Sequence, residues 1–197
     1  MNTALLNLEG LACERDHRLL FQHLDLTLLQ GEILELTGPN GSGKTTLLRC
    51  LAGLSSDFEG EIEIGSFLYL GHASGISSLL TARENQHWYA SLTGLEVTDS
   101  ELDTALARVG LDGYQNVPCG QLSAGQKRRV VLSRLLFSQA LLWLLDEPLT
   151  ALDQQGITLI GELMREHSAR DGGVLYATHQ SLTLPNLREL DLAVHRG

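Results

Sequence analysis

The hydrophobic positions of the chain follow two periods, one typical of strands and one typical of helices. Residues 3–12 and 18–30 are leucine-rich runs in which apolar and polar residues alternate, so they predict the strands of a small antiparallel sheet. Residues 60–65 alternate in the same way, and residues 67–70 form a short apolar strand. The first third of the chain is therefore expected to be mostly strand.

Helical spacing dominates the middle of the chain. Apolar residues recur on one face after three polar residues that can cap a helix: Thr81, then Asp99 or Ser100, then Ser123. The helix after Ser123 is expected to reach about residue 138, and residues 157–167 form a further amphipathic helix.

Two unbroken apolar runs, residues 140–145 and 174–177, have the length of buried strands. Strands that alternate with helices predict an α/β fold with a mainly parallel sheet. We expect a single domain over residues 1–197, in which a helical subdomain (74–138) is inserted into a core made of residues 1–73 and 139–197.

Composition narrows the class of protein. The chain has 197 residues, 43% of them hydrophobic, and a formal net charge of −10, so it reads as a globular domain without the broad positive field of a nucleic-acid binder. The basic triplet Lys127–Arg129 is interpreted as a solvated helix face. The apolar stretch 130–145 is interrupted by polar residues and is too short and too polar to span a bilayer.

The cysteines and the N-terminus give further expectations. The three cysteines are scattered and contain no C-x-x-C pair, which argues against disulfides or zinc and favours a reducing compartment. Cys50 is expected to be a buried thiol. The first ten residues lack a basic start followed by a long apolar segment, so no signal peptide is expected.

The strongest chemical signal is the glycine-rich stretch 38–45, which follows an apolar strand and precedes a helix. It matches the pattern G-x-x-x-x-G-K-[ST], and glycines allow successive backbone N–H groups to point at one anion. Lys44 is expected to reach the β- and γ-phosphates, and the Thr45 hydroxyl to bind Mg²⁺. The sequence predicts a nucleoside triphosphate site with these residues: Gly38, Pro39, Asn40, Gly41, Ser42, Gly43, Lys44, Thr45 and Thr46.

Two carboxylates follow the apolar run 140–145. Asp146 and Glu147 stand at the carboxyl end of that strand, where open α/β sheets bind their ligands. Asp146 is expected to hold Mg²⁺ beside Thr45. Glu147 is expected to orient or deprotonate the water that attacks the γ-phosphate.

A second anion site is predicted at the start of the helix after residue 122. The Ser123 hydroxyl and the Gly125 amide lie at a fresh helix N-terminus, where unpaired amides attract an anion. One nucleotide does not need two such sites in one domain. The second site is therefore expected to serve a nucleotide bound to a second copy of the chain.

Taken together, these motifs resemble the ATP-binding cassette (ABC) family. The segment Leu122, Ser123, Ala124, Gly125, Gln126 stands where that family has LSGGQ, its signature segment. Asp153 in the string TALD resembles the family's D-loop, and His179 resembles its switch histidine, which senses the γ-phosphate. The resemblance implies a P-loop NTPase of RecA-like fold that binds ATP with Mg²⁺. It also implies a head-to-tail homodimer in which Lys44 of one copy and Ser123 of the other hold the same ATP.

A narrower resemblance concerns the strings CERD, LTAREN and LWLLDEPLTALD, which are similar to the CcmA family of cytochrome c maturation ATPases. It implies the ATP-hydrolysing subunit of a haem exporter, bound peripherally to the cytoplasmic face of the bacterial inner membrane. Implied partners are membrane subunits of the CcmB, CcmC and CcmD type. ATP turnover is then expected to drive release of the haem-loaded chaperone CcmE.

The chain departs from the family pattern at two positions. Where the family has a glutamine that contacts Mg²⁺ and the attacking water, this chain has Ala73, so either coupling is weaker or His72 substitutes. The aromatic residue that usually stacks on adenine aligns near Arg15, whose guanidinium can also stack on a base. Arg15 is therefore included among the nucleotide-binding residues.

Other readings stay open. The chain can instead serve another ABC exporter, of lipoprotein or drug type, or act as a coupling module with little turnover. A soluble ABC ATPase that remodels ribosomes or DNA ends is disfavoured by the acidic charge. A haem site within this chain is not supported, since neither Cys119 nor His87 has partners in the sequence pattern. The patch around Ile76, Leu79 and Leu80 is the expected contact with a membrane subunit.

Overall fold

A computed structural model describes residues 3–15, 17–180, 182, 184 and 187–195. The chain forms two compact units. The first comprises Met1–Gly71, Ala140–Pro148 and Gly161–Gly197, and the second comprises His72–Gln139 and Leu149–Ile160. The second unit thus contains the range 74–138 expected for the helical subdomain and takes in residues 149–160 as well.

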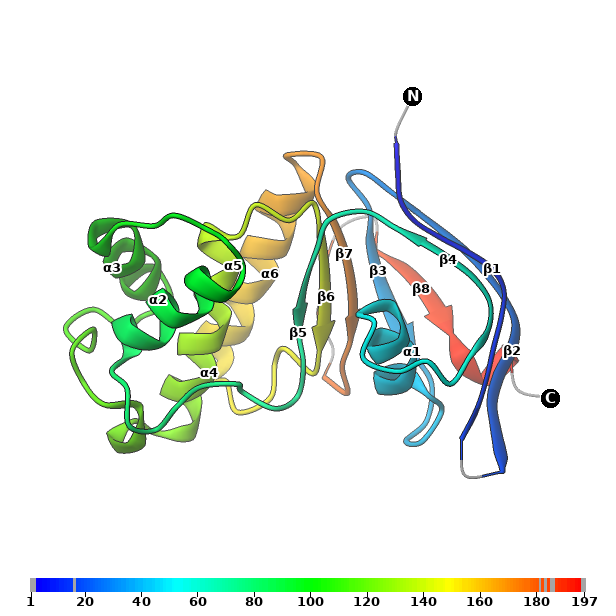
Figure 1. The fold of residues 1–197 in the computed structure, drawn as a ribbon, viewed down its shortest axis with the longest axis horizontal. Coiled ribbons are helices and arrows are strands. Elements are labelled where there is room, and N and C mark those ends of the chain that lie inside the picture. The colour runs from blue at the N-terminus through cyan, green and yellow to red at the C-terminus, as the bar shows by residue number, and fades with distance from the viewer. Residues whose placement is uncertain (1–2, 16, 181, 183, 185–186, 196–197) are drawn as a thin grey trace. The chain divides into compact units, whose positions relative to one another are not determined.

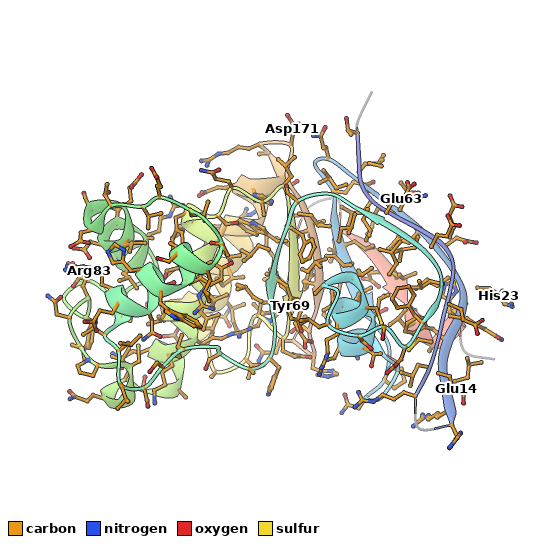
Figure 2. The ribbon with its side chains drawn as sticks, viewed as in Figure 1. Glu14, His23, Glu63, Tyr69, Arg83 and Asp171 are labelled. Carbon is orange, nitrogen blue, oxygen red and sulfur yellow. The ribbon has the colours of Figure 1, made fainter. Side chains whose placement is uncertain are left out.

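The first unit contains a three-stranded antiparallel sheet (Figure 1) made of β1 (Ala4–Arg15), β2 (Arg18–Leu29) and β4 (Glu59–Ile64), in the order β2-β1-β4. This confirms the antiparallel sheet expected from residues 3–12 and 18–30. Alternation sorts the two faces: leucines of β1 and β2 point into the core, whereas Glu63 and His23 point outward (Figure 2).

The first unit also contains a five-stranded parallel sheet with the order β5-β6-β7-β3-β8 (Figure 1). Its strands are β3 (Ile33–Thr37), β5 (Phe67–Leu70), β6 (Leu142–Asp146), β7 (Gly173–Ala177) and β8 (Arg188–Asp191). Every residue of β6 and β7 is buried, as their unbroken apolar runs predicted. The sequence did not indicate β8 or the short helix η2 (Leu192–His195), because β8 is an edge strand with mostly exposed, charged residues.

Helix α1 (Lys44–Leu51) packs its leucines into the same core as the strand leucines. Leu47, Leu48 and Leu51 are each at most 2% exposed, and Cys50 is a free, buried thiol, as expected. Because each fully buried leucine contributes roughly 1.5–3 kcal/mol, this packing holds the loop before α1 against the sheet. Helix α6 (Gln154–Ser168) begins in the second unit and ends in the first.

The second unit consists of α2 (Ala82–Leu92), α3 (Asp99–Arg108), η1 (Cys119–Gln121), α4 (Ala124–Leu132) and α5 (Arg134–Phe137), together with the start of α6. Thr81 and Ser123 cap α2 and α4, as expected. The cap of α3 is Thr98 rather than Asp99 or Ser100. The Thr98 hydroxyl accepts the Glu101 N–H, and the Glu101 carboxylate accepts the Thr98 N–H, a reciprocal pair that fixes the helix start one residue earlier.

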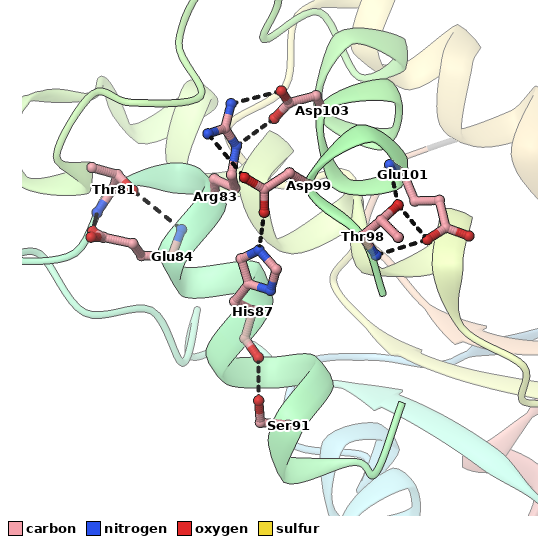
Figure 3. Close-up of polar contacts among 9 residues, drawn as sticks. All are labelled: Thr81, Arg83, Glu84, His87, Ser91, Thr98, Asp99, Glu101 and Asp103. Carbon is pink, nitrogen blue, oxygen red and sulfur yellow. Dashed lines mark hydrogen bonds and ion pairs between the residues drawn. The ribbon is translucent and has the colours of Figure 1, made fainter. Parts of the chain in front are cut away.

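Charged side chains join α2 to α3 on the surface of the second unit (Figure 3). Arg83 donates two hydrogen bonds to the Asp103 carboxylate, from Nε at 2.7 Å and from Nη2 at 2.6 Å. Asp99 lies between Arg83 and His87, with its Oδ1 2.6 Å from His87 Nε2. This network gives His87 a structural partner that the sequence pattern did not reveal.

The expectation that Lys127–Arg129 forms a solvated helix face is wrong. Arg128 is only 7% exposed, and the Arg129 guanidinium bonds a backbone carbonyl and a carboxylate within the second unit. A run of basic residues on a helix cannot reveal such acceptors, because they come from segments that are distant in the sequence. Of these three basic residues, Lys127 alone makes no side-chain hydrogen bond or ion pair with the residues that the structure describes.

Candidate functional site: an ATP site and a separate signature edge

The phosphate loop (residues 38–45) joins β3 to α1 in the first unit. Three of its glycines have φ angles that other residues rarely adopt: 126° at Gly38, 74° at Gly41 and 101° at Gly43. Gly43 is also crowded, since a Cβ there would lie 3.1 Å from the Phe21 ring of β2. The loop conformation therefore requires glycine both for the backbone angle and for the contact with β2.

The polar groups of the loop are arranged around an anion site. Helix α1 begins at Gly43, which offers no side chain to cap the first N–H groups of the helix. The Ser42 hydroxyl is buried and has no hydrogen-bond partner among the described residues. The Lys44 ammonium donates to the carbonyls of Gly38 at 2.6 Å and Pro39 at 3.3 Å, so it lies folded over its own loop. Uncapped amides, a buried hydroxyl and an ammonium together fit a polyphosphate.

A metal corner adjoins the loop. The Thr45 hydroxyl donates to Asp146 Oδ1 at 3.0 Å, although the two residues are 101 positions apart. Asp146 is only 1% exposed and ends β6, so the sheet holds its carboxylate in place. Mg²⁺ is usually held by one or two protein oxygens together with phosphates and water, and these two side chains fit that requirement. Among the described residues, no group of three or more His, Cys, Asp or Glu side chains is arranged so that it could hold a metal ion.

The next residue, Glu147, is held in an unusual conformation. Its φ angle is 51°, which costs energy for a residue with a side chain, and its N–H donates to the Ala177 carbonyl at 2.8 Å. The Glu147 carboxylate lies 3.3 Å from His179 Nε2, across the ends of β6 and β7. The structure thus brings together two residues that the sequence predicted separately, 32 positions apart in numbering.

A cavity of about 740 Å³ in the first unit lies beside α1 and includes Arg15 and Thr46 in its lining. Arg15 shares this cavity with Thr46, the residue that follows the phosphate loop, and its stacking on the base stays a prediction. Cys13 and Cys50 line the same cavity. Burial raises the pKa of both thiols, that of Cys50 to about 11, so they are protonated at neutral pH and are poor metal ligands.

The sequence analysis did not predict a role for Arg18. At the start of β2, its Nη1 lies 3.9 Å from the position of a Cβ on Gly41, and so against the backbone of the phosphate loop. The signal was weak because an exposed arginine at the end of a hairpin is common. Only the packing of β2 on the loop shows that this cation accompanies the anion site.

The second unit carries the signature segment. The Ser123 hydroxyl oxygen accepts the Gln126 N–H at 3.2 Å, and the Gln126 side chain accepts the Ser123 N–H at 2.9 Å. Ser123 is exposed, and its hydroxyl hydrogen remains available for donation. Leu122, in contrast, is buried in the core of this unit. The exposed part of the signature segment therefore starts at Ser123.

The signature segment lies beside the D-loop (residues 150–153). A cavity of about 310 Å³ is lined by Ser123, Gly125, Gln126, Arg129, Ala151 and Asp153. Asp153 Oδ1 accepts the Gly156 N–H at 2.9 Å and so caps α6.

His72 and Ala73, at the start of the second unit, are both exposed.

Comparison with known proteins identifies the family. The ABC transporter family model matches residues 21–150. The chain is 45% identical to the "Cytochrome c biogenesis ATP-binding export protein CcmA" of Saccharophagus degradans, covering 96% of this chain and 93% of the relative. A protein of the same name from Pseudomonas fluorescens is 44% identical, with 98% of each chain covered.

Solved structures give the same result. A "Putative ABC transporter (ATP-binding protein)" from Pyrococcus furiosus is 25% identical, with a TM-score of 0.86 over 98% of this chain and 99% of that one. In the part of the chain that is described, no helix has the length and apolar character needed to cross a membrane. The fold, the phosphate loop and these likenesses together show that the chain belongs to the ABC transporter family, as one of its nucleotide-binding ATPases.

Proposed function

We propose that the chain hydrolyses ATP at a site formed by the phosphate loop and the residues that end β6 and β7. The Lys44 ammonium exchanges its bonds to the Gly38 and Pro39 carbonyls for contacts with the β- and γ-phosphates, and the loop amides bind the same phosphates. Thr45 and Asp146 would hold Mg²⁺, which would supply positive charge against the phosphates. The observation that carries this proposal is the Thr45–Asp146 hydrogen bond beside an uncapped helix.

Glu147 is the proposed general base. Its carboxylate accepts a proton from, or orients, the water that attacks the γ-phosphorus, and the strained backbone keeps it at the end of β6. His179, 3.3 Å away, contacts the γ-phosphate and responds to its loss. This division of roles leaves Asp146 for the metal and Glu147 for the water.

The signature segment serves the nucleotide of a second copy. Ser123 has its oxygen committed to capping α4 but retains a hydroxyl hydrogen, which is suited to an oxygen of the γ-phosphate. ATP thus draws two copies into a head-to-tail homodimer with two nucleotides at the interface. Hydrolysis removes the phosphate that both copies hold and lets them separate.

The proposed process is export in cytochrome c biogenesis. Relatives at 44–45% identity over nearly the full chain carry that function in their names, which favours it over export of lipoproteins or drugs. We propose that the chain lies at the cytoplasmic face of the bacterial inner membrane. There it powers a haem exporter complex with membrane subunits of the CcmB, CcmC and CcmD type, and drives release of haem-loaded CcmE.

The proposed contact with a membrane subunit is the loop around Leu79. Leu79 is 88% exposed, whereas Ile76 is half-buried against the helical core. The loop backbone is nevertheless well held: the Asn85 amide donates to the Ser77 and Leu80 carbonyls and accepts the Ser77 N–H. An apolar side chain displayed on a fixed loop suits a partner's apolar pocket.

The test replaces the chain in its host by the Glu147→Gln variant. Removing the base should lower phosphate release by about 10²–10³-fold while ATP binding is kept. Haem-stained c-type cytochromes should disappear, and the tagged variant should still co-purify with its membrane subunits. Normal c-type cytochromes with the variant present at the usual level would contradict the proposed process, and a defect in lipoprotein or drug export would support the alternative.

A coupling module with little turnover is the second candidate, favoured by Ala73. A phosphate-release assay on the unmodified chain and on Ala73→Gln separates the two. Strong basal release by the unmodified chain removes this candidate, and a large gain on Ala73→Gln supports it.

A further inference from the structure

One side chain ties the signature helix to the D-loop. Arg129, on α4, donates from Nη2 to Asp153 Oδ1 at 2.7 Å and from Nη1 to the Val109 carbonyl at 2.7 Å, where α3 ends. Its side chain is 18% exposed. A planar guanidinium can hold two acceptors in different directions, whereas a lysine ammonium is a single point. Arg129 thereby joins α3, α4 and the residue before α6.

The backbone around Arg129 is built to admit it. A Cβ on Gly110 would lie 2.8 Å from Arg129 Nη1, and a Cβ on Gly156 would lie 3.2 Å from Nη2. A Cβ on Gly125 would lie 2.9 Å from the Ala151 carbonyl, so the signature segment touches the D-loop directly. Glycine at these three positions leaves room for the Arg129 side chain and for the contact between the two segments.

The Asp153 carboxylate is held as an anion. The Gly156 N–H keeps the pKa of Asp153 below its ordinary value, and Arg129 adds to this effect. Its Oδ1 accepts bonds from both groups, so the D-loop is fixed at this residue even though 65% of the side chain is exposed.

We propose that Arg129 is a positioning residue that makes Ser123 and Asp153 one rigid edge, presented as a unit to a second copy of the chain and its nucleotide. Both residues line the same cavity. The inference rests on the proposed function in one respect, that Ser123 serves the nucleotide of the second copy. In this proposal Arg129 acts through Asp153 and the signature helix rather than by contact with the nucleotide.

The test is the Arg129→Met variant in a Glu147→Gln background, in which slow hydrolysis is expected to preserve the ATP-bound dimer. Loss of a charge-assisted bridge should weaken ATP-driven dimerisation by about tenfold, measured by analytical ultracentrifugation. Binding of ATP to the monomer, measured at low protein concentration, should stay within about twofold. Lys127→Met is the matched control, since Lys127 lies on the same helix without a bridging contact, and it should leave both quantities unchanged.

Two further variants separate positioning from simple stability. Asp153→Asn should weaken dimerisation, and adding Arg129→Met should weaken it little further, because both remove the charge pairing of the same bridge. Arg129→Lys should recover part of the loss. Unchanged dimerisation in Arg129→Met, or additive losses in the double variant, would overturn the role of Arg129 alone. Failure of the Glu147→Gln parent itself to dimerise with ATP would overturn the arrangement in trans as well.

Discussion

The two helix starts that we propose to contact phosphate differ in how their backbone amides are satisfied. Helix α1 begins at Gly43, without any side-chain cap. Helix α4 begins at Ser123 with a complete capping box. The first therefore leaves its amides to a ligand, whereas in the second the capping box satisfies the Ser123 and Gln126 N–H groups and Ser123 still offers a hydroxyl hydrogen.

This difference predicts which helix start binds the nucleotide within one chain and which contributes only in a dimer. An uncapped helix after a glycine loop gains its missing hydrogen bonds from the phosphates, so it should bind nucleotide strongly and within one chain. A capped helix has less to gain, so it should contribute mainly when a second copy brings the phosphate to it. Four predictions test this contrast, beginning with the largest effect.

Lys44→Ala should abolish the first site. Loss of the ammonium from the uncapped end should lower turnover by about 10²–10³-fold and remove measurable ATP binding. Isothermal titration with ATP and Mg²⁺ checks the binding, and circular dichroism checks that the fold survives. Retained micromolar ATP affinity would contradict the assignment of binding to α1.

Ser123→Ala should lower turnover and leave ATP binding at the start of α1 nearly unchanged. Turnover should fall by about 10- to 100-fold, the worth of a hydrogen bond to a charged group, while ATP binding to the monomer stays within about twofold. Loss of the cap should also lower the melting temperature by about 2–4 °C.

Two control variants isolate the hydroxyl hydrogen of Ser123. Thr98→Ala removes an equivalent capping box from α3 and should lower the melting temperature without lowering turnover. Ser123→Asp restores a good cap but adds negative charge and no hydrogen, so turnover should stay low. Recovery of turnover in Ser123→Asp would show that capping alone is needed.

Arg18→Gln should weaken nucleotide binding in proportion to phosphate number. An exposed cation beside Gly41 is worth up to about 1 kcal/mol, so the Kd for ATP should rise about threefold to fivefold and that for AMP hardly at all. Arg15→Gln is the matched comparison: if Arg15 stacks on the base, ATP and AMP should lose affinity equally. Equal losses in Arg18→Gln would assign Arg18 to the base instead.

The smallest effect concerns pH and the helix caps. Bonds from the Thr81 and Thr98 backbones hold the pKa values of Glu84 and Glu101 below their ordinary value of 4.5. A pKa that is lowered by folding stabilises the folded state above 4.5, and that contribution is lost as pH falls through the folded-state pKa. The box of α4 uses Gln126, which does not titrate. Amide NMR shifts of Thr81 and Thr98 should therefore move in acid, whereas that of Ser123 should not.

Much of the fold was predictable because it follows local rules. Alternating leucines gave β1 and β2, and unbroken apolar runs gave β6 and β7. The α3 cap was misplaced by one residue because Thr98, Asp99 and Ser100 are all acceptable caps, and only the position of Glu101 relative to Thr98 decides among them. Strand β8 was missed because an exposed edge strand lacks the hydrophobic pattern that marks a strand.

The candidate site likewise has features that local sequence predicted and features that it did not. The glycine pattern and the order of motifs pointed to the phosphate loop, the two carboxylates and the signature segment, because these depend on residue type and local spacing. The sequence also placed Asp146 beside Thr45, but the hydrogen bond between them, the Glu147–His179 pair and the bridge from Arg129 to Asp153 were decided only by the tertiary structure. Each joins residues that are far apart along the chain, and only the packing of strands and helices brings their atoms within hydrogen-bond or ion-pair distance.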